Sequence, residues 1–220
     1  MNASEDIFRA YDIRGVYGEE LDAEIGERVG LAFGNYLMKT HRSGKISIGC
    51  DARVSSPELQ MAVSRGVSKA GFGVDVIGMV PIPVANYFTW KSNLNSENYI
   101  AGVYITASHN PAEYNGIRFR HPDGTGFTEG NLEIKKIFFE DELVESEAGI
   151  IEELSTELVL EDYMNFVSKK VGSLKGIKVA LDPGNGVGCV VVDRIFKKLG
   201  ADTFCICLLY TSDAADEDLR

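Results

Sequence analysis

The sequence has no long apolar run and little cysteine. Its hydrophobic stretches are brief and interrupted by charged residues, so none is long enough to span a bilayer. Residues 1–6 lack the basic and apolar regions of a secretory signal peptide. The cysteines are Cys50, Cys189, Cys205 and Cys207. They form no C-x-x-C pair and have no histidine at ligand spacing, which argues against a zinc site and a disulfide framework. We therefore expect reduced thiols and a cytoplasmic protein.

Positive charge is also scarce. Lys and Arg number 22 against 33 Asp and Glu, which gives a formal net charge of -11 over 220 residues. Such a balance argues against a nucleic-acid or membrane-surface partner, because both are polyanions. A chain this acidic can bind an anionic ligand only where it gathers its arginines and lysines locally. The remaining composition, 45% apolar and 25% charged, is ordinary for a globular protein.

Strand and helix patterns alternate along the first 140 residues. The predicted strands cover residues 45–50, 73–78, 99–105 and 116–121. Predicted helices begin near Asp22, Ser55 and Pro81, and a fourth covers residues 128–139. This succession favours an α/β fold with a mixed, largely parallel sheet layered with helices. Residues 8–15 are too polar to alternate as a strand would, and we predict a loop there after a short strand.

A change in composition predicts a domain boundary. Residues 140–157 are rich in Glu and poor in aromatic residues, which is typical of a solvated linker or helix face. We expect a first domain over residues 1–150 and an incomplete second α/β domain over residues 155–206. The glycine-rich turn at residues 182–188 lacks the spacing of a dinucleotide site and reads as a tight βα connection. Residues 207–220 are polar and predict a non-native or disordered tail.

The segment Thr-Ala-Ser-His-Asn-Pro, residues 106–111, ends the apolar run of residues 99–105. Ser108 has three interpretations: a turn serine, a hydrolase nucleophile, or a phosphoryl carrier. A Ser-His pair is disfavoured because adjacent side chains of an extended segment point to opposite faces, so His109 would be poorly placed to activate Ser108. No G-x-S-x-G motif surrounds the serine either.

Four motifs in order resemble those of the phosphohexomutases, the phosphomannomutase/phosphoglucomutase family. They are FRAYDIRG (residues 8–15), GCDARVSSPEL (49–59), TASHNP (106–111) and YNGIRF (114–119). The resemblance covers residues 7 to about 205 and implies the N-terminal portion of such an enzyme. It implies that Ser108 carries a phosphoryl group, that His109 and Arg118 take part in catalysis, and that Tyr11, Arg14 and Asn110 bind substrate.

The resemblance also implies Mg²⁺ as cofactor and a hexose 1,6-bisphosphate as activator and intermediate. In the family, the ion contacts the serine phosphate and three aspartates of a D-G-D-G-D-R loop. This sequence has no such loop, so Ser108 is the one expected metal-contacting residue, through its phosphate. Arg118 stands where the family usually has a lysine, and a guanidinium is a poor general base. His109 is therefore the better titratable candidate.

The first functional hypothesis is an intramolecular phosphotransferase that interconverts the 1- and 6-phosphates of mannose or glucose. A phosphoglucosamine mutase is the alternative within that class. A non-catalytic fragment that binds phosphorylated sugars is the alternative outside it. Because the aspartate loop and two later family domains are missing, we expect the 220-residue chain alone to be inactive as a mutase, with no turnover of hexose phosphates.

Overall fold

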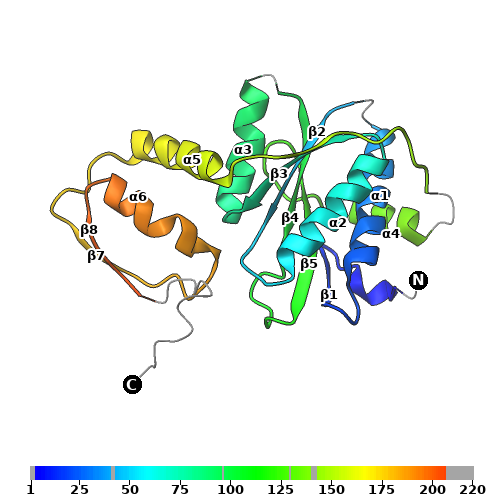
Figure 1. The fold of residues 1–220 in the computed structure, drawn as a ribbon, viewed down its shortest axis with the longest axis horizontal. Coiled ribbons are helices and arrows are strands. Elements are labelled where there is room, and N and C mark those ends of the chain that lie inside the picture. The colour runs from blue at the N-terminus through cyan, green and yellow to red at the C-terminus, as the bar shows by residue number, and fades with distance from the viewer. Residues whose placement is uncertain (1–2, 41–42, 96, 129, 140–142, 207–220) are drawn as a thin grey trace. The chain divides into compact units, whose positions relative to one another are not determined.

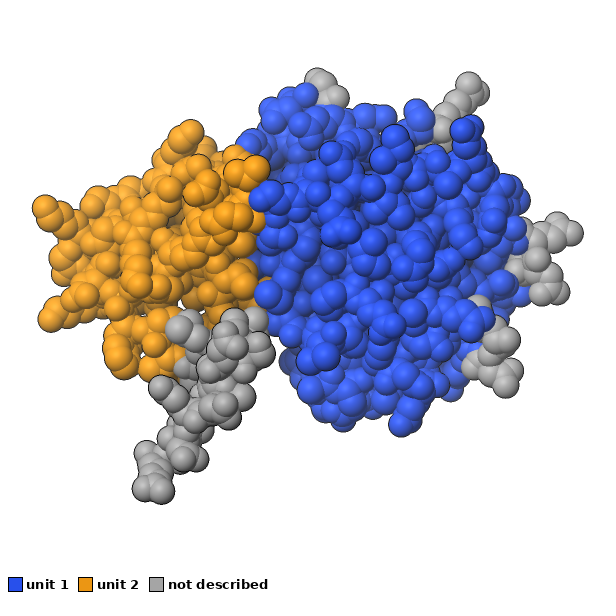
Figure 2. All heavy atoms as spheres, viewed as in Figure 1, with its two compact units in different colours: residues 1–156 blue, residues 157–220 orange. Residues whose placement is uncertain are grey.

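The computed structural model describes residues 3–40, 43–95, 97–128, 130–139 and 143–206. The predicted tail at residues 207–220 lies outside these ranges. The chain divides into two compact units, Met1–Thr156 and Glu157–Arg220, which Figure 2 shows in different colours. Among the described helices, none is both long and apolar enough to cross a membrane.

The first unit is built on a six-stranded sheet with the order β1-β5-β4-β2-β3-β6 (Figure 1). The strands are β1 (Ile13–Val16), β2 (Lys45–Cys50), β3 (Gly73–Met79), β4 (Tyr99–Ile105), β5 (Tyr114–Arg120) and β6 (Ile151–Glu153). The four strands β4, β2, β3 and β6 run parallel, whereas β5 is antiparallel to both β4 and β1. The predicted mixed, largely parallel α/β sheet is therefore confirmed.

Helices cover both faces of this sheet. They are α1 (Ala23–Met38), α2 (Ser56–Lys69), α3 (Ile82–Leu94) and α4 (Asn131–Phe139). Asp22 caps α1 as predicted, since its carboxylate accepts the Ile25 N–H at 2.8 Å. In β2, Ile46 and Ile48 join the core that α1 and α2 cover. Ser47 bonds Thr89 of α3 at 2.6 Å, so α3 lies on the opposite face.

Glycines allow α1 and α2 to pack closely. A Cβ added at Gly30 would lie 2.3 Å from the Val63 carbonyl oxygen, and one at Gly66 would lie 1.9 Å from the Glu27 carbonyl oxygen. Both clashes involve backbone atoms that a side-chain rotation cannot move. The two helices lie side by side in Figure 1. The sequence GCDARVSS thus connects a buried strand to a firmly packed helix.

Two local predictions are wrong. Residues 8–15 are not a loop throughout, because β1 begins at Ile13 and pairs with β5. Residues 140–157 include the strand β6, where Ile151 pairs with Val74 of β3. Both strands lie at sheet edges, where polar residues are tolerated and the alternation of a buried strand is not needed.

The second unit, taken by itself, is a small α/β arrangement. It contains α5 (Thr156–Val171), β7 (Lys178–Leu181), η2 (Val187–Val190), α6 (Val192–Lys198) and β8 (Asp202–Cys205). The strands β7 and β8 pair in parallel, with Lys178 opposite Asp202. The glycine-rich segment between β7 and η2 places Asn185 in the left-handed region, at a φ of 55°.

Candidate active site

The turn after β4 holds Ser108 in an unusual backbone conformation. Its φ is 59°, in the left-handed region, which costs a residue with a side chain about 1 kcal/mol or more. Thr106 and Ala107 are buried, whereas Ser108 and His109 are exposed. The chain therefore leaves the sheet and presents the serine hydroxyl to solvent, and the surrounding contacts must outweigh the backbone cost.

Arg53 supplies many of these contacts. Its guanidinium reaches from the loop after β2 into the Ser108 turn, and its side chain is only 12% exposed. Its carbonyl acceptors are those of Ser108 (3.1 Å), Asn110 (2.8 Å), Pro111 (2.6 Å) and Tyr114 (2.9 Å). The Nε–H group donates to Asp51 Oδ2 at 3.2 Å. We call this arrangement of Arg53 around the four carbonyls the carbonyl clamp.

Asp51 connects the clamp to the sheet. Its Oδ1 accepts the Ser56 hydroxyl at 2.6 Å and the Arg53 backbone N–H at 3.1 Å. Its Oδ2 accepts the Thr106 hydroxyl at 2.6 Å, and Thr106 Oγ1 in turn accepts the Ser108 N–H at 2.9 Å. The buried carboxylate is therefore satisfied on both oxygens, as a charge removed from water requires.

A hollow of about 620 Å³ opens beside the turn, and we call it the arginine pocket. Its lining residues are Arg9, Tyr11, Asp12, Arg14, Asn110, Pro111, Tyr114 and Arg118. Three arginines thus face one carboxylate in a protein whose net charge is strongly negative. This is the local concentration of cations that an anionic ligand needs.

Arg14 lines this pocket and contacts two of its other lining residues. Its Nη1 donates to Asn110 Oδ1 at 2.9 Å, and its Nη2 donates to the Asp12 carboxylate. Its Nε is buried and has no hydrogen-bond partner among the described residues. Arg118 Nε lies 3.9 Å from the same Asp12 oxygen. One carboxylate therefore serves two guanidinium groups, which leaves donor capacity for an anion.

Arg120, two residues further along β5, adds to the positive field. Burial lowers its pKa, and repulsion from Arg118 acts in the same direction. Its Nε is also buried without a partner in the described part of the chain. A guanidinium nevertheless stays protonated at neutral pH. The same face of β5 therefore carries two cations in succession.

The family comparison agrees with this architecture. Residues 5–145 match the family model described as phosphoglucomutase/phosphomannomutase, alpha/beta/alpha domain I. The chain belongs to the phosphoglucomutase/phosphomannomutase family. The phosphoglucosamine mutase of Clostridium acetobutylicum is 36% identical over 208 residues, and that of Acetivibrio thermocellus is 35% identical over 207 residues. Each alignment covers 91% of this chain and 45% of the relative, so the chain spans less than half the length of these relatives.

Solved structures of the family have the same fold. A phosphoglucomutase/phosphomannomutase family protein from Burkholderia thailandensis superposes with a TM-score of 0.80 and 30% identity. That match covers 94% of this chain and 44% of the other. A putative phosphomannomutase from Thermus thermophilus has a TM-score of 0.74, with 90% and 45% of the two chains covered. At 21% identity, this second likeness concerns the fold alone.

The structure brings four of the six predicted site residues together in one pocket. Tyr11, which is 65% exposed, lines the arginine pocket with Arg14, Asn110 and Arg118. Ser108 and His109 do not line the pocket, but they directly precede Asn110 and Pro111, which do. The expected separation of their side chains is wrong, because Ser108 is not extended. Its Oγ lies 3.3 Å from His109 Nδ1.

Two features of this candidate site were not predicted from the sequence. Arg9 and Asp12 line the arginine pocket, although only their neighbours Tyr11 and Arg14 were predicted to bind substrate. For Asp51 and Arg53, the sequence leaves a structural ion pair and a role in the site equally open. In the structure, Arg53 pairs with Asp51 and also binds four carbonyls of the Ser108 turn. The D-x-R spacing after a buried strand was the available signal.

The magnesium site implied by the family is not formed by the described residues. No group of three or more His, Cys, Asp or Glu side chains within them is placed to hold a metal ion. Mg²⁺ prefers several oxygen ligands in near-octahedral geometry, and Ser108 with its neighbours does not supply such a set. The chemistry below is therefore argued from the chain's own residues.

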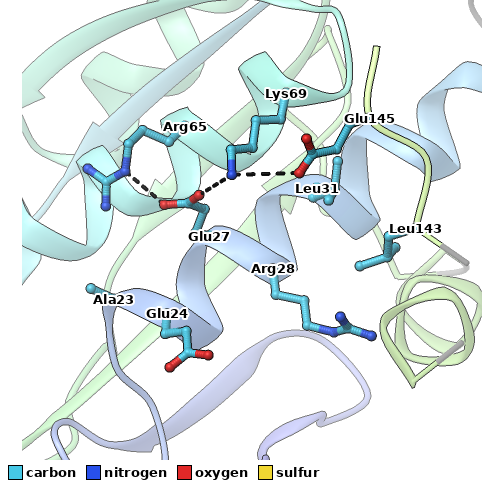
Figure 3. A pocket seen from close by; sticks show the side chains of 9 residues that line it. All are labelled: Ala23, Glu24, Glu27, Arg28, Leu31, Arg65, Lys69, Leu143 and Glu145. Carbon is cyan, nitrogen blue, oxygen red and sulfur yellow. Dashed lines mark hydrogen bonds and ion pairs between the residues drawn. The ribbon is translucent and has the colours of Figure 1, made fainter. Parts of the chain in front are cut away.

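A second hollow, of about 600 Å³, lies between α1 and α2 (Figure 3). Figure 3 shows Glu27 between Arg65 and Lys69, and Lys69 between Glu27 and Glu145. The carboxylate oxygens of Glu27 lie 2.8 Å from Arg65 Nε and 2.9 Å from Lys69 Nζ, and Lys69 Nζ lies 3.6 Å from a Glu145 carboxylate oxygen. The hydrogen bond from Lys69 is the main cause that lowers the pKa of Glu27. Three acidic and three basic residues line this hollow, so their charges cancel, whereas the arginine pocket has an excess of positive charge. We call it the balanced hollow.

Proposed function

We propose that these residues form the phosphoryl-carrying part of an intramolecular phosphotransferase. The reaction interconverts hexose 1-phosphates and hexose 6-phosphates, with glucose or mannose as the sugar. Ser108 carries the phosphoryl group, and a hexose 1,6-bisphosphate is the intermediate. Family membership supports the reaction class, and the position of Ser108 beside the arginine pocket supports its role.

The observation that carries the proposal is an exposed serine on a fixed turn. In the loading step, Ser108 Oγ forms a bond to a phosphorus of the bisphosphate while the bond from that phosphorus to the sugar oxygen breaks. The serine proton passes to a base, and the sugar oxygen takes up a proton. His109 Nδ1, 3.3 Å from Oγ, is the titratable group placed to take the serine proton. Transfer in the opposite direction phosphorylates a hexose monophosphate and regenerates the serine.

The arginine pocket holds the anionic substrate in this proposal. Arg14 and Arg118 offer guanidinium groups, which match the planar geometry of phosphate oxygens. Phosphoryl transfer depends on positioning and on neutralising the charge of the transferring group. Because Arg118 stays protonated, it holds a phosphate rather than moving a proton. Asn110 bonds Arg14 and belongs to the Ser108 turn, so it connects substrate binding with the serine.

Glucosamine phosphate is the second candidate sugar. The two relatives from Clostridium acetobutylicum and Acetivibrio thermocellus, at 36% and 35% identity, are phosphoglucosamine mutases. Comparing phosphoryl loading by the 1,6-bisphosphates of glucose, mannose and glucosamine under identical conditions would rank the three sugars. Faster loading by the glucosamine compound would transfer the proposal to that substrate.

The test is to map phosphoryl groups on the purified 220-residue chain, as expressed and after incubation with glucose 1,6-bisphosphate and Mg²⁺. We expect one phosphoryl group, on Ser108, in peptides analysed by mass spectrometry, and none in Ser108→Ala. An adduct on another residue would contradict the role of Ser108. If the chain bound glucose 6-phosphate but acquired no adduct, it would be a non-catalytic phosphosugar-binding domain.

A further inference from the structure

Arg53 uses its whole hydrogen-bonding capacity within the protein. A guanidinium has five N–H groups and no acceptor. The structure gives Arg53 five side-chain bonds: one from Nε to Asp51, two from Nη1 and two from Nη2 to the carbonyls of the clamp. Each N–H is therefore matched by one acceptor. A phosphate could bind Arg53 only by displacing a backbone carbonyl.

We propose that Arg53 is a positioning residue that fixes the left-handed conformation of Ser108 and does not bind the phosphoryl group. The inference rests on the proposed function in one respect: that function explains why the conformation is needed, namely to present Ser108 Oγ to the substrate. The saturated donor set itself is independent of any reaction. The Arg53 side chain is also only 12% exposed, which limits its access to a ligand in solvent.

Both peptide groups that flank Ser108 are held by the same ion pair. On the N-terminal side, the Ser108 N–H donates to Thr106 Oγ1, whose own hydroxyl donates to Asp51. On the C-terminal side, the Ser108 carbonyl accepts from Arg53 Nη2 at 3.1 Å. Fixing the N–H and the carbonyl of one residue fixes its φ and ψ. Asp51 and Arg53, themselves paired, thus impose a conformation that serine would otherwise avoid.

The fork shape of the guanidinium is essential to this role. The four carbonyls belong to residues spread from 108 to 114, and they converge on two nitrogens of one planar group. A lysine ammonium has three donors on a single nitrogen and could not reach all four acceptors while keeping its bond to Asp51. The positive charge alone is therefore not sufficient, and Arg53→Lys should loosen the turn.

The experiment measures amide hydrogen exchange at Ser108, Asn110 and Tyr114 in the unliganded 220-residue chain. The variants are Arg53→Ala and Arg53→Lys, with Arg65→Lys as the control in the balanced hollow. We expect exchange at these three amides to accelerate by about tenfold or more in both Arg53 variants. Amides of β2 and β3 should keep their protection. Adding methylguanidinium to Arg53→Ala should restore slow exchange, whereas methylammonium, with the same charge, should not.

Unchanged exchange in both variants would overturn the inference, and so would equal rescue by methylammonium, because a point charge would then suffice. If Arg53→Ala unfolds, Arg53→Lys decides, since it keeps a cation beside Asp51. No phosphate is present in this experiment. If the exchange results were as expected but the chain never acquired a phosphoryl group, the proposed function would be contradicted and the role of Arg53 would still hold.

Discussion

The carbonyl clamp and the arginine pocket both contact the Ser108 turn and use arginine in opposite ways. In the clamp, each of the five N–H groups of Arg53 has an acceptor within the protein. In the pocket, Arg14 has a buried Nε without a partner among the described residues and shares Asp12 with Arg118. Counting donors therefore distinguishes an arginine that holds the backbone from one that can hold a ligand.

Asn110 joins the two regions. Its backbone carbonyl accepts from Arg53 at 2.8 Å, and its side-chain oxygen accepts from Arg14 at 2.9 Å. The turn that carries Ser108 is therefore held by Arg53 and is also in contact with Arg14, which lines the arginine pocket. Pre-organised charge of this kind is effective because it needs no rearrangement when the ligand arrives.

The largest expected effect follows from removing the serine. Ser108→Ala should reduce phosphoryl loading from glucose 1,6-bisphosphate by several orders of magnitude, because no other hydroxyl occupies its position. Binding of glucose 6-phosphate, measured by calorimetry, should stay within about twofold since the pocket cations remain. A comparable loss of binding would mean that the Ser108 turn itself contributes to substrate binding, so that the roles of the clamp and the pocket could not be distinguished.

Removing Arg14, one of the three arginines of the pocket, should have the next largest effect. Arg14→Ala should weaken glucose 6-phosphate binding by about 10- to 100-fold, the range for a lost hydrogen bond between charged groups. Arg65→Ala, in the balanced hollow, is the matched control and should bind normally. If the two variants bound equally well, Arg14 would be an ordinary surface-loop arginine.

A smaller effect is expected where the clamp meets the sheet. Thr106→Val keeps the shape of the side chain but removes the acceptor of the Ser108 N–H and a donor to Asp51. Leaving buried polar groups unpaired should lower the free energy of unfolding by about 1–3 kcal/mol, measured by urea denaturation. Thr106→Ser restores both hydrogen bonds and serves as the control. Equal losses in both variants would assign the effect to packing.

The smallest effect is expected in the balanced hollow. The pKa of Glu27 lies below its ordinary value of 4.5, mainly because Lys69 donates to it. A carboxyl with a lowered pKa stabilises the folded state above its unfolded pKa, and this contribution is lost as the pH falls through the folded value. Glu27→Gln should therefore be slightly less stable than the parent at pH 7, by less than about 1 kcal/mol, and equal to it below the folded pKa. Thermal unfolding at both pH values checks this, and a constant difference would contradict the electrostatic explanation.

The sheet could be predicted where burial imposes a pattern. The strand at residues 45–50 was predicted with the bounds that the structure gives, because β2 lies at the centre of a parallel sheet and is almost entirely buried. The edge strands β1 and β6 were missed. In β6, two of three residues are glutamates, and the strand exists because β3 offers backbone partners that the local sequence does not show.

Several residues of the arginine pocket could be predicted from the sequence, but the geometry of the turn could not. Motif resemblance placed Tyr11, Arg14, Asn110 and Arg118 in one site, and the structure brings them together in the arginine pocket. The clamp could not be predicted, because four of the acceptors of Arg53 are backbone carbonyls, which leave no trace in side-chain identity. The approach of His109 to Ser108 depends on a φ of 59°, which an extended strand end does not suggest.

The account is tested most directly by NMR spectroscopy of the arginine Nε–Hε groups during titration of the 220-residue chain with glucose 6-phosphate. Arg14→Lys and Arg53→Lys assign the two signals. The account predicts that the Arg14 signal shifts progressively with saturation, because Arg14 lines the arginine pocket and its Nε has no hydrogen-bond partner among the described residues, while the Arg53 signal stays in place. A shift of the Arg53 signal with a stationary Arg14 signal would contradict it.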